Sequence, residues 1–315
     1  MNSRERVRER DTQYRFQYTA GNGAIVYVID TGVRASHDQF GGRVHPLKTY
    51  YPEEGNKDFI GHGTHVAGTI ASRTYGVAKN TQIRAIKIYN KDELYHDGSI
   101  LIDAIQTAYR DASDTASEYP SAFKGAVINM SLGGERSQSC NDVVNSAVRA
   151  GMHIVVAAGN DDRDACEVSP ASARLAITVG ASTIDDVRAE FSNYGKCVDV
   201  FAPGVDILST WNTDDRATNV IQGTSMASPH VAGLVAYFLS IYPHRTFHPR
   251  SYLRDEDALL YEPRLFQKNE STPLLQGNMG LSPYLMKKEI IRLSTRGRLY
   301  DVKGSPNSLA YNNYP

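Results

Sequence analysis

The chain has 315 residues, of which 41% are hydrophobic and 22% are charged, and its formal net charge is −1. This is the balance of a globular protein with a large core, so collagenous, coiled-coil and intrinsically disordered chains are excluded. A net charge close to zero provides no basic surface for nucleic acid or for anionic membranes, so neither is expected as a partner. The longest apolar stretch, residues 231–242, is too short to cross a bilayer.

Short apolar runs recur along the first two thirds of the chain. They are near-continuous in Val, Ile and Ala, which is typical of parallel strands buried on both faces. Helical patterns at 98–111 and 140–150 separate some of them, and this alternation predicts right-handed crossovers. The fold class expected is therefore α/β, a three-layer sandwich with a central, mostly parallel sheet and helices on both faces. The runs are residues 24–30, 82–89, 126–132, 153–159, 176–181 and 198–204.

The last third of the chain has helical patterns at both ends and an irregular segment between them. One helix is expected over residues 225–242, and another begins at Pro283, a residue that suits a first helical turn. Residues 243–281 are rich in proline and charge, so they are interpreted as an insertion and not as a second domain. We therefore expect a single domain over residues 1–315. No apolar segment occurs near residue 1, so no signal peptide is expected in the chain. The first predicted strand already begins at residue 24, which leaves no room for a pro-domain before it.

Three junctions place a reactive side chain beside glycine. Asp30 ends an apolar run, and ligands of open α/β sheets bind at the carboxyl ends of strands. His62 lies between two glycines at the start of a predicted helix, and Ser225 follows a glycine-containing turn before an apolar helix. Each also has a purely structural interpretation: a turn cap for Asp30, a core or surface group for His62, and an N-cap for Ser225.

His62 and His65 also form a candidate metal pair, because residues three apart share one face of a helix. Zinc motifs usually add a general-base glutamate and a third ligand, and neither is evident nearby. The segment around Ser225 lacks the G-x-S-x-G pattern of the α/β-hydrolases. What remains is an acid, a base and a nucleophile in the chain order Asp, His, Ser, the order that subtilisin has.

The segments around these three residues resemble the active-site signatures of the subtilisin-like serine proteases (subtilases, peptidase family S8). They read VYVIDTG at 26–32, GHGTHVAGT at 61–69 and GTSMASPHVAG at 223–233. The closer resemblance is to the proteinase K branch of the family. It is carried by residues 73–82, 131–134, 191–195, 207–211 and 309–314.

The resemblance implies a serine endopeptidase that works through an acyl-enzyme intermediate. Ser225 would be the nucleophile, His62 its general base, and Asp30 the group that orients the imidazole. Asn160 matches the oxyanion-hole asparagine of the family, with the backbone N–H of Ser225 as the second donor. No catalytic cofactor is implied. The alternative function is that of a non-catalytic relative that binds peptides or regulates another protein.

The substrate-binding residues are likewise implied by the resemblance. A peptide would pair as a strand with Ser131, Leu132, Gly133 and Gly134. Ala157, Ala158 and Gly159 would leave room for the side chain before the scissile bond. Broad specificity with a large apolar or aromatic residue at that position follows. Residues 91–97 depart from the glycine-rich edge of the proteinase K branch, which leaves the preference at remote subsites open.

The remaining implied features concern stability and location. Asp199, with the backbone carbonyls of Arg174 and Ala176, matches a structural calcium site, although a solvated aspartate is the alternative. Cys166 and Cys197 match a disulfide and leave Cys140 as a free thiol, the alternative being three unpaired thiols. We expect a monomer that acts on protein or peptide substrates. The location expected is extracellular, with a vacuolar or intracellular one as the alternative.

Overall fold

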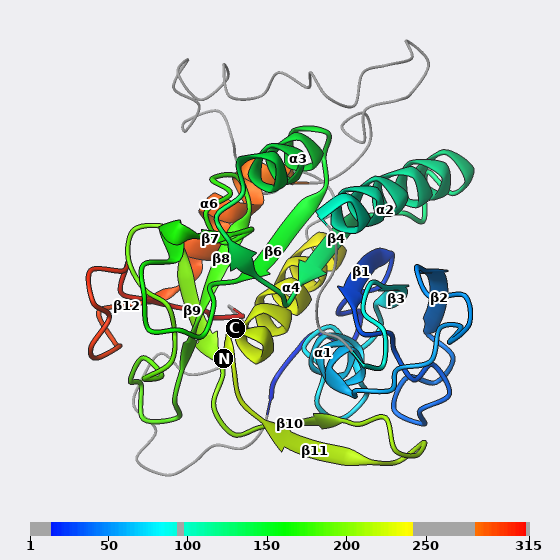
Figure 1. The fold of residues 1–315 in the computed structure, drawn as a ribbon, viewed down its shortest axis with the longest axis horizontal. Coiled ribbons are helices and arrows are strands. Elements are labelled where there is room, and N and C mark those ends of the chain that lie inside the picture. Colours follow the sequence, from blue (N-terminus) through cyan, green and yellow to red (C-terminus); the bar gives the residue numbers. More distant parts are fainter. Residues whose placement is uncertain (1–13, 93–97, 242–280, 313–315) are drawn as a thin grey trace.

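The computed structural model describes residues 14–92, 98–241 and 281–312. A nine-stranded sheet lies at the centre, in the order β12-β13-β9-β8-β6-β4-β1-β3-β2 (Figure 1). Neighbouring strands pair in parallel, and the one antiparallel pair in this sheet is β12 with β13. The strands are β1 (Ala24–Asp30), β2 (Val44–Thr49), β3 (Gln82–Lys87), β4 (Gly125–Met130), β6 (His153–Ala157), β8 (Ile177–Ser182), β9 (Val200–Pro203), β12 (Thr295–Arg296) and β13 (Ser308–Leu309).

Helices cover both faces of this sheet. Val26 and Val28 of β1 belong to a core shared with α1 and α4, while Ile25, Tyr27 and Ile29 belong to a second core shared with α2 and α3. Because successive side chains of a strand point to opposite faces, these two cores lie on opposite sides of the sheet. The expected three-layer α/β sandwich is confirmed. The described helices are α1 (His62–Ala71), α2 (Gly98–Glu118), α3 (Gln138–Arg149), α4 (Thr224–Ile241), α6 (Pro283–Leu293) and the 3₁₀ turn η1 (Ala165–Glu167).

The helix ends follow local capping chemistry. α3 begins at Gln138, two residues before the expected start, because Ser137 Oγ accepts the N–H of Cys140. α6 begins at Pro283 as expected, and Ser282 caps it. α2 extends to Glu118, seven residues beyond the expected end, and the first part of this extension, Ala112 and Ser113, is buried.

Two small antiparallel ribbons accompany the main sheet. β10 (Ile207–Thr210) pairs with β11 (Thr218–Ile221) beside α1, and β5 (Gly134–Glu135) pairs with β7 (Val168–Ser169). None of the described helices is long and apolar enough to span a membrane. The insertion expected at 243–281 lies outside the described residues except for the buried Leu281, as do residues 93–97 of the departing edge segment.

Candidate active site

Asp30 and His62 meet where β1 ends and α1 begins. Asp30 Oδ1 lies 2.8 Å from His62 Nδ1 and also accepts the N–H of Thr31 at 2.7 Å. The carboxylate is almost fully buried, whereas the imidazole is about a quarter exposed. A Cβ on Gly63 would lie 2.1 Å from the carbonyl oxygen of Gly32. Glycine at position 63 therefore lets the helix approach the end of the strand closely enough for the two side chains to bond.

The first turn of α1 is held by a residue that the sequence analysis did not single out. The buried carboxylate of Asp58 accepts the N–H groups of Gly61 (2.8 Å) and Thr64 (2.9 Å) and the hydroxyl of Thr31 (2.9 Å). An anion at a helix N-terminus satisfies free N–H groups and opposes the positive end of the helix dipole. The available signal was an acidic residue four positions before His62, which is typical of a helix start.

The surroundings of His62 raise its pKa. Burial of the imidazole acts to lower the pKa, but the charge and hydrogen bond of Asp30, together with the charge of Asp58, outweigh it. A histidine with a raised pKa is a stronger proton acceptor, as a general base requires. Because Nδ1 faces the Asp30 carboxylate, Nε2 is the ring nitrogen left to exchange a proton with another group.

Ser225 lies in the first turn of α4 and is tied to the end of β4. Its hydroxyl donates to the carbonyl oxygen of Ser131 at 3.2 Å, and the Ser131 hydroxyl donates to the carbonyl oxygen of Ser225 at 2.8 Å. Among the described residues, Ser225 makes no hydrogen bond with His62. Such nucleophile–base bonds are often long in free enzymes and tighten when substrate binds. The structure thus joins Asp30 to His62 but does not join His62 to Ser225.

Asn160 follows β6 and faces the first turn of α4. Its Oδ1 accepts both the N–H and the hydroxyl of Thr224, each at 2.8 Å, so the Nδ2 group is left as a donor. A Cβ on Gly223 would lie 3.6 Å from Asn160 Nδ2 and 3.6 Å from the backbone nitrogen of Ser225. Two hydrogen-bond donors therefore border one small space, which glycine at 223 keeps open. An oxyanion could accept both of them there.

Comparison with known proteins decides the family. Residues 21–259 match the subtilase family, Peptidase_S8. The chain belongs to the subtilase family. It is 44% identical to the subtilisin-like serine protease Rho m 2.0101 of Rhodotorula mucilaginosa, 44% to cerevisin of Saccharomyces cerevisiae and 42% to alkaline protease 2 of Aspergillus fumigatus. The predicted enzyme class, a subtilisin-like serine protease, is confirmed.

These alignments cover 95% of the chain in each case. The chain spans 80% of the length of the Rhodotorula protein, but only 44% of cerevisin and 56% of alkaline protease 2. A solved structure described as a cold-adapted subtilisin-like serine proteinase superposes with a TM-score of 0.77 at 33% identity. That superposition covers 97% of this chain and 94% of the other.

In this subtilase, only some of the predicted substrate-binding residues line a cavity. Leu132, Gly133 and Gly134 line a cavity of about 440 Å³, whose wall includes the apolar side chains of Leu101 and Ile105. Ser131 lies beside it, bonded to Ser225. Ala157 ends β6 and Ala158 follows it; both are buried and do not line this cavity, while Gly159 is partly exposed.

The predicted calcium ligands converge, but on a lysine. The ammonium of Lys287, on α6, lies 3.0 Å from the carbonyl oxygen of Arg174, 2.6 Å from that of Ala176 and 2.8 Å from Asp199 Oδ2. A cation already bound by these three oxygens leaves no place for Ca²⁺ between them, so the arrangement does not fit the metal. Burial raises the pKa of Asp199, while Lys287 and the N–H of Thr178 act in the opposite direction.

The cysteines of the subtilase differ in state. Cys166 and Cys197 are bonded, with Cα atoms 5.3 Å apart. Cys140 is free and partly exposed, and it lines the 440 Å³ cavity. Burial raises the pKa of its thiol to about 11, so little thiolate forms near neutral pH.

Proposed function

We propose that this subtilase is an endopeptidase that hydrolyses peptide bonds through an acyl-enzyme on Ser225. The observation that carries the proposal is the 2.8 Å contact between buried Asp30 and His62. That pair lies at the carboxyl end of β1, the edge where active sites of open α/β sheets form. Two donors, Asn160 Nδ2 and the Ser225 N–H, border a common space, as acyl transfer requires.

In the proposed reaction, Ser225 Oγ attacks the peptide carbonyl carbon while His62 Nε2 takes the hydroxyl proton. The negative charge that develops on the carbonyl oxygen is stabilised by Asn160 and the Ser225 N–H. His62 then returns the proton to the leaving amine as the C–N bond breaks. Asp30 holds the Nδ1–H tautomer and stabilises the imidazolium. Water, deprotonated by His62, hydrolyses the ester and restores Ser225.

We further propose broad specificity, with large apolar or aromatic residues before the scissile bond. This preference rests on the family resemblance, because Ala157, Ala158 and Gly159 do not line the cavity beside Leu132, Gly133 and Gly134. The apolar wall of that cavity supports binding of another apolar side chain of the substrate. The protein would act as a monomer on proteins or peptides. An extracellular location is proposed on the family resemblance.

The test compares the wild type with Ser225→Ala on a peptide series that varies the residue before the cleaved bond. We expect serine-reagent-sensitive cleavage that is fastest after Phe or Leu, and loss of nearly all turnover in Ser225→Ala. Ser117→Ala, at the end of α2, is a matched control whose hydroxyl bonds within its own helix. Peptide binding without cleavage by the wild type would favour the alternative, a non-catalytic peptide-binding relative.

A further inference from the structure

The side-chain amide of Asn193 holds the loop that carries Asn160. Asn193 is fully buried. Its Nδ2 donates to the carbonyl oxygen of Ala158 at 2.9 Å, and its Oδ1 accepts the N–H groups of Asp161 at 3.0 Å and Arg163 at 3.1 Å. One side chain thus binds the backbone on both sides of Asn160. These bonds use both donor and acceptor capacity of a buried amide, whose loss would leave polar groups unpaired.

Gly159 shows how closely the amide fits this loop. The φ of Gly159 is +104°, and a Cβ there would lie only 2.2 Å from Asn193 Nδ2. The backbone N–H of Asn193 also donates to the carbonyl oxygen of Gly159 at 3.0 Å. The Asn193 side chain therefore occupies the space that a side chain at position 159 would need. The two residues together set the path of the backbone into Asn160.

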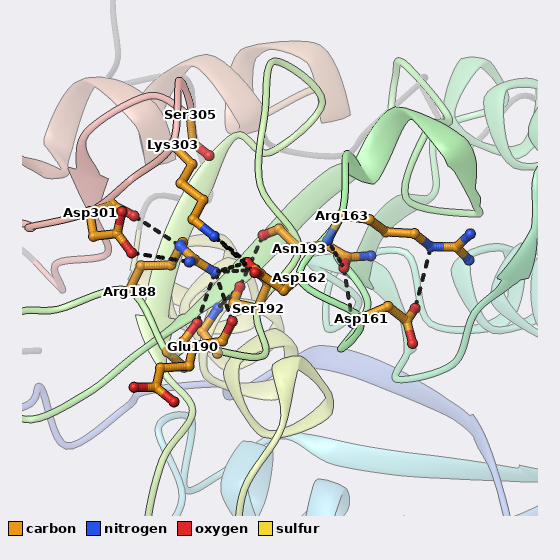
Figure 2. A network of polar contacts seen from close by, with 12 residues as sticks. Asp161, Asp162, Arg163, Arg188, Glu190, Ser192, Asn193, Asp301, Lys303 and Ser305 are labelled. Atoms are coloured by element: carbon orange, nitrogen blue, oxygen red, sulfur yellow. Dashed lines mark hydrogen bonds and ion pairs between the residues drawn. The ribbon is translucent and has the colours of Figure 1, made fainter.

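A buried arginine anchors the segment that presents Asn193 (Figure 2). The guanidinium of Arg188 is 1% exposed and donates to the carbonyl oxygens of Ala189 (3.0 Å) and Glu190 (3.2 Å). It also pairs with Asp162 at 3.0 Å and with Asp301 at 3.1 Å. Arg188 thereby binds both the segment at 189–193 and Asp162, which lies two residues after Asn160.

The opposite side of Asn160 is fixed by α4, since Thr224 holds the Oδ1 atom through two bonds. The Nδ2 donor is thus aimed by Thr224 and carried by a backbone that Asn193 holds. Oxyanion donors act within a narrow range, about 2.7–3.1 Å from the developing charge, and a misplacement of about 1 Å can cost about 10²-fold in rate.

We propose that Asn193 is a positioning residue for catalysis, which acts by holding Asn160 where its amide meets the oxyanion. The inference rests on the proposed function. It predicts a specific defect in Asn193→Ala: kcat falls by about 10–100-fold, while KM changes by no more than about twofold, because substrate contacts remain. Asn193→Ser, which retains a shorter acceptor, should lose less.

The decisive experiment is a double-mutant cycle with Asn160→Ala, which by itself should lower kcat by about 10²–10³-fold. If Asn193 acts through Asn160, adding Asn193→Ala to Asn160→Ala should change kcat by less than about threefold. Asn145→Ala is the matched control, because its Oδ1 also accepts a backbone N–H of a loop, that of Leu175 at 2.9 Å, but from helix α3 and away from the loop that carries Asn160. It should lower the melting temperature without lowering kcat.

The outcomes separate the two proposals. If Asn160→Ala loses kcat but Asn193→Ala does not, or if the two losses multiply in the double variant, the positioning role is overturned and the proposed function stands. If neither the wild type nor any variant cleaves peptides, the proposed function itself fails. Should Asn193→Ala fail to fold, the same cycle is run with Asn193→Ser, for which the same coupling is required.

Discussion

Replacing Lys287 by Met should expose how much the internal cation stabilises this subtilase. Met retains most of the length and apolar volume of the side chain but removes the ammonium that binds Arg174, Ala176 and Asp199. Asp199 would then remain in place without its counter-charge. Its pKa, already raised by burial, should rise further, so the carboxyl should take up a proton at higher pH than in the wild type.

The magnitude follows from the burial of the pair. Breaking a buried ion pair by removing one partner costs about 3–5 kcal/mol. The two side chains remain 19% and 16% exposed, which places this pair at the low end, about 3 kcal/mol. Since unfolding entropy is about 2.1 cal/mol/K per residue, a chain of this length should lose about 4–5 °C in melting temperature. The deficit should shrink on acidification, because a protonated Asp199 no longer needs the cation.

Calorimetry in a Ser225→Ala background, which removes self-digestion, measures the effect. Lys288→Met is the matched control: the same residue type, next along α6, with its ammonium over the ring of Tyr284. Equal melting temperatures for the two variants would refute the reasoning.

In a Lys287→Ala variant the vacated space borders two carbonyls and a carboxylate, so millimolar Ca²⁺ should stabilise it more than the wild type. No difference in the calcium effect would contradict that part.

Three further predictions follow from the described contacts. Replacing Cys166 and Cys197 together by Ser should lower the free energy of unfolding by about 3–4 kcal/mol, because the disulfide closes a loop of 31 residues. Urea unfolding in the Ser225→Ala background would measure this loss, and a loss under about 1 kcal/mol would contradict the prediction. In Asp30→Asn the pKa of His62 should fall, because the carboxylate that raises it is removed. The acid limb of the pH–kcat profile should then move to lower pH while kcat itself drops. An acid limb that does not move would argue against the pairing of Asp30 with His62. Three histidines, two buried and one partly buried, have pKa values held below their ordinary value of 6.5. The unfolded chain therefore binds more protons, and stability should fall as the pH drops from 6.5 to about 4, by about 1.4 kcal/mol per pH unit for each residue. Unfolding free energies that stay level between pH 7 and 5 would exclude this. These residues are His65 (about 4), His153 (about 3) and His230 (about 4).

The parts of the fold that could be predicted are the buried strands, which appear in the sequence as continuous runs of apolar residues. β1 coincides with the predicted run at 24–30, because a strand buried on both faces must be apolar throughout. β2 was missed, since it lies at the sheet edge, contains Pro46 and is partly exposed, so it lacks that signature. The β10–β11 ribbon was missed because its strands are short and partly polar.

The candidate site also has a part that the sequence indicates and a part that it does not. Asp30, His62 and Ser225 stand in segments whose pattern is visible in the sequence, so the roles proposed for them could be inferred from it. The residues that hold the Asn160 loop and the predicted calcium ligands could not be inferred, because each acts on a distant segment. Asn193 binds Ala158 across 35 positions, and Lys287 binds Ala176 across 111. Asn193 does lie in the 191–195 segment that carries the family resemblance, but that segment does not indicate which backbone groups its side chain binds. No local pattern distinguishes Lys287 from a surface lysine. Lys287 also shows that a matching ligand set in sequence does not identify the cation it binds.

The contact between Arg15 and Asn312 bears on the resistance of this protease to autolysis. Asn312 Nδ2 donates to the carbonyl oxygen of Arg15 at 2.8 Å, across 297 positions. β13 joins the sheet beside β9, so the edge is completed by residues more than 100 positions away. Folding dominated by such distant pairings is slow. Within the described residues, the segments around Arg15 and Asn312 hold each other in place, which opposes local fraying there. Where cleavage of the described part of the chain requires global opening, substitutions that slow unfolding should extend the lifetime of the enzyme even if equilibrium stability barely changes.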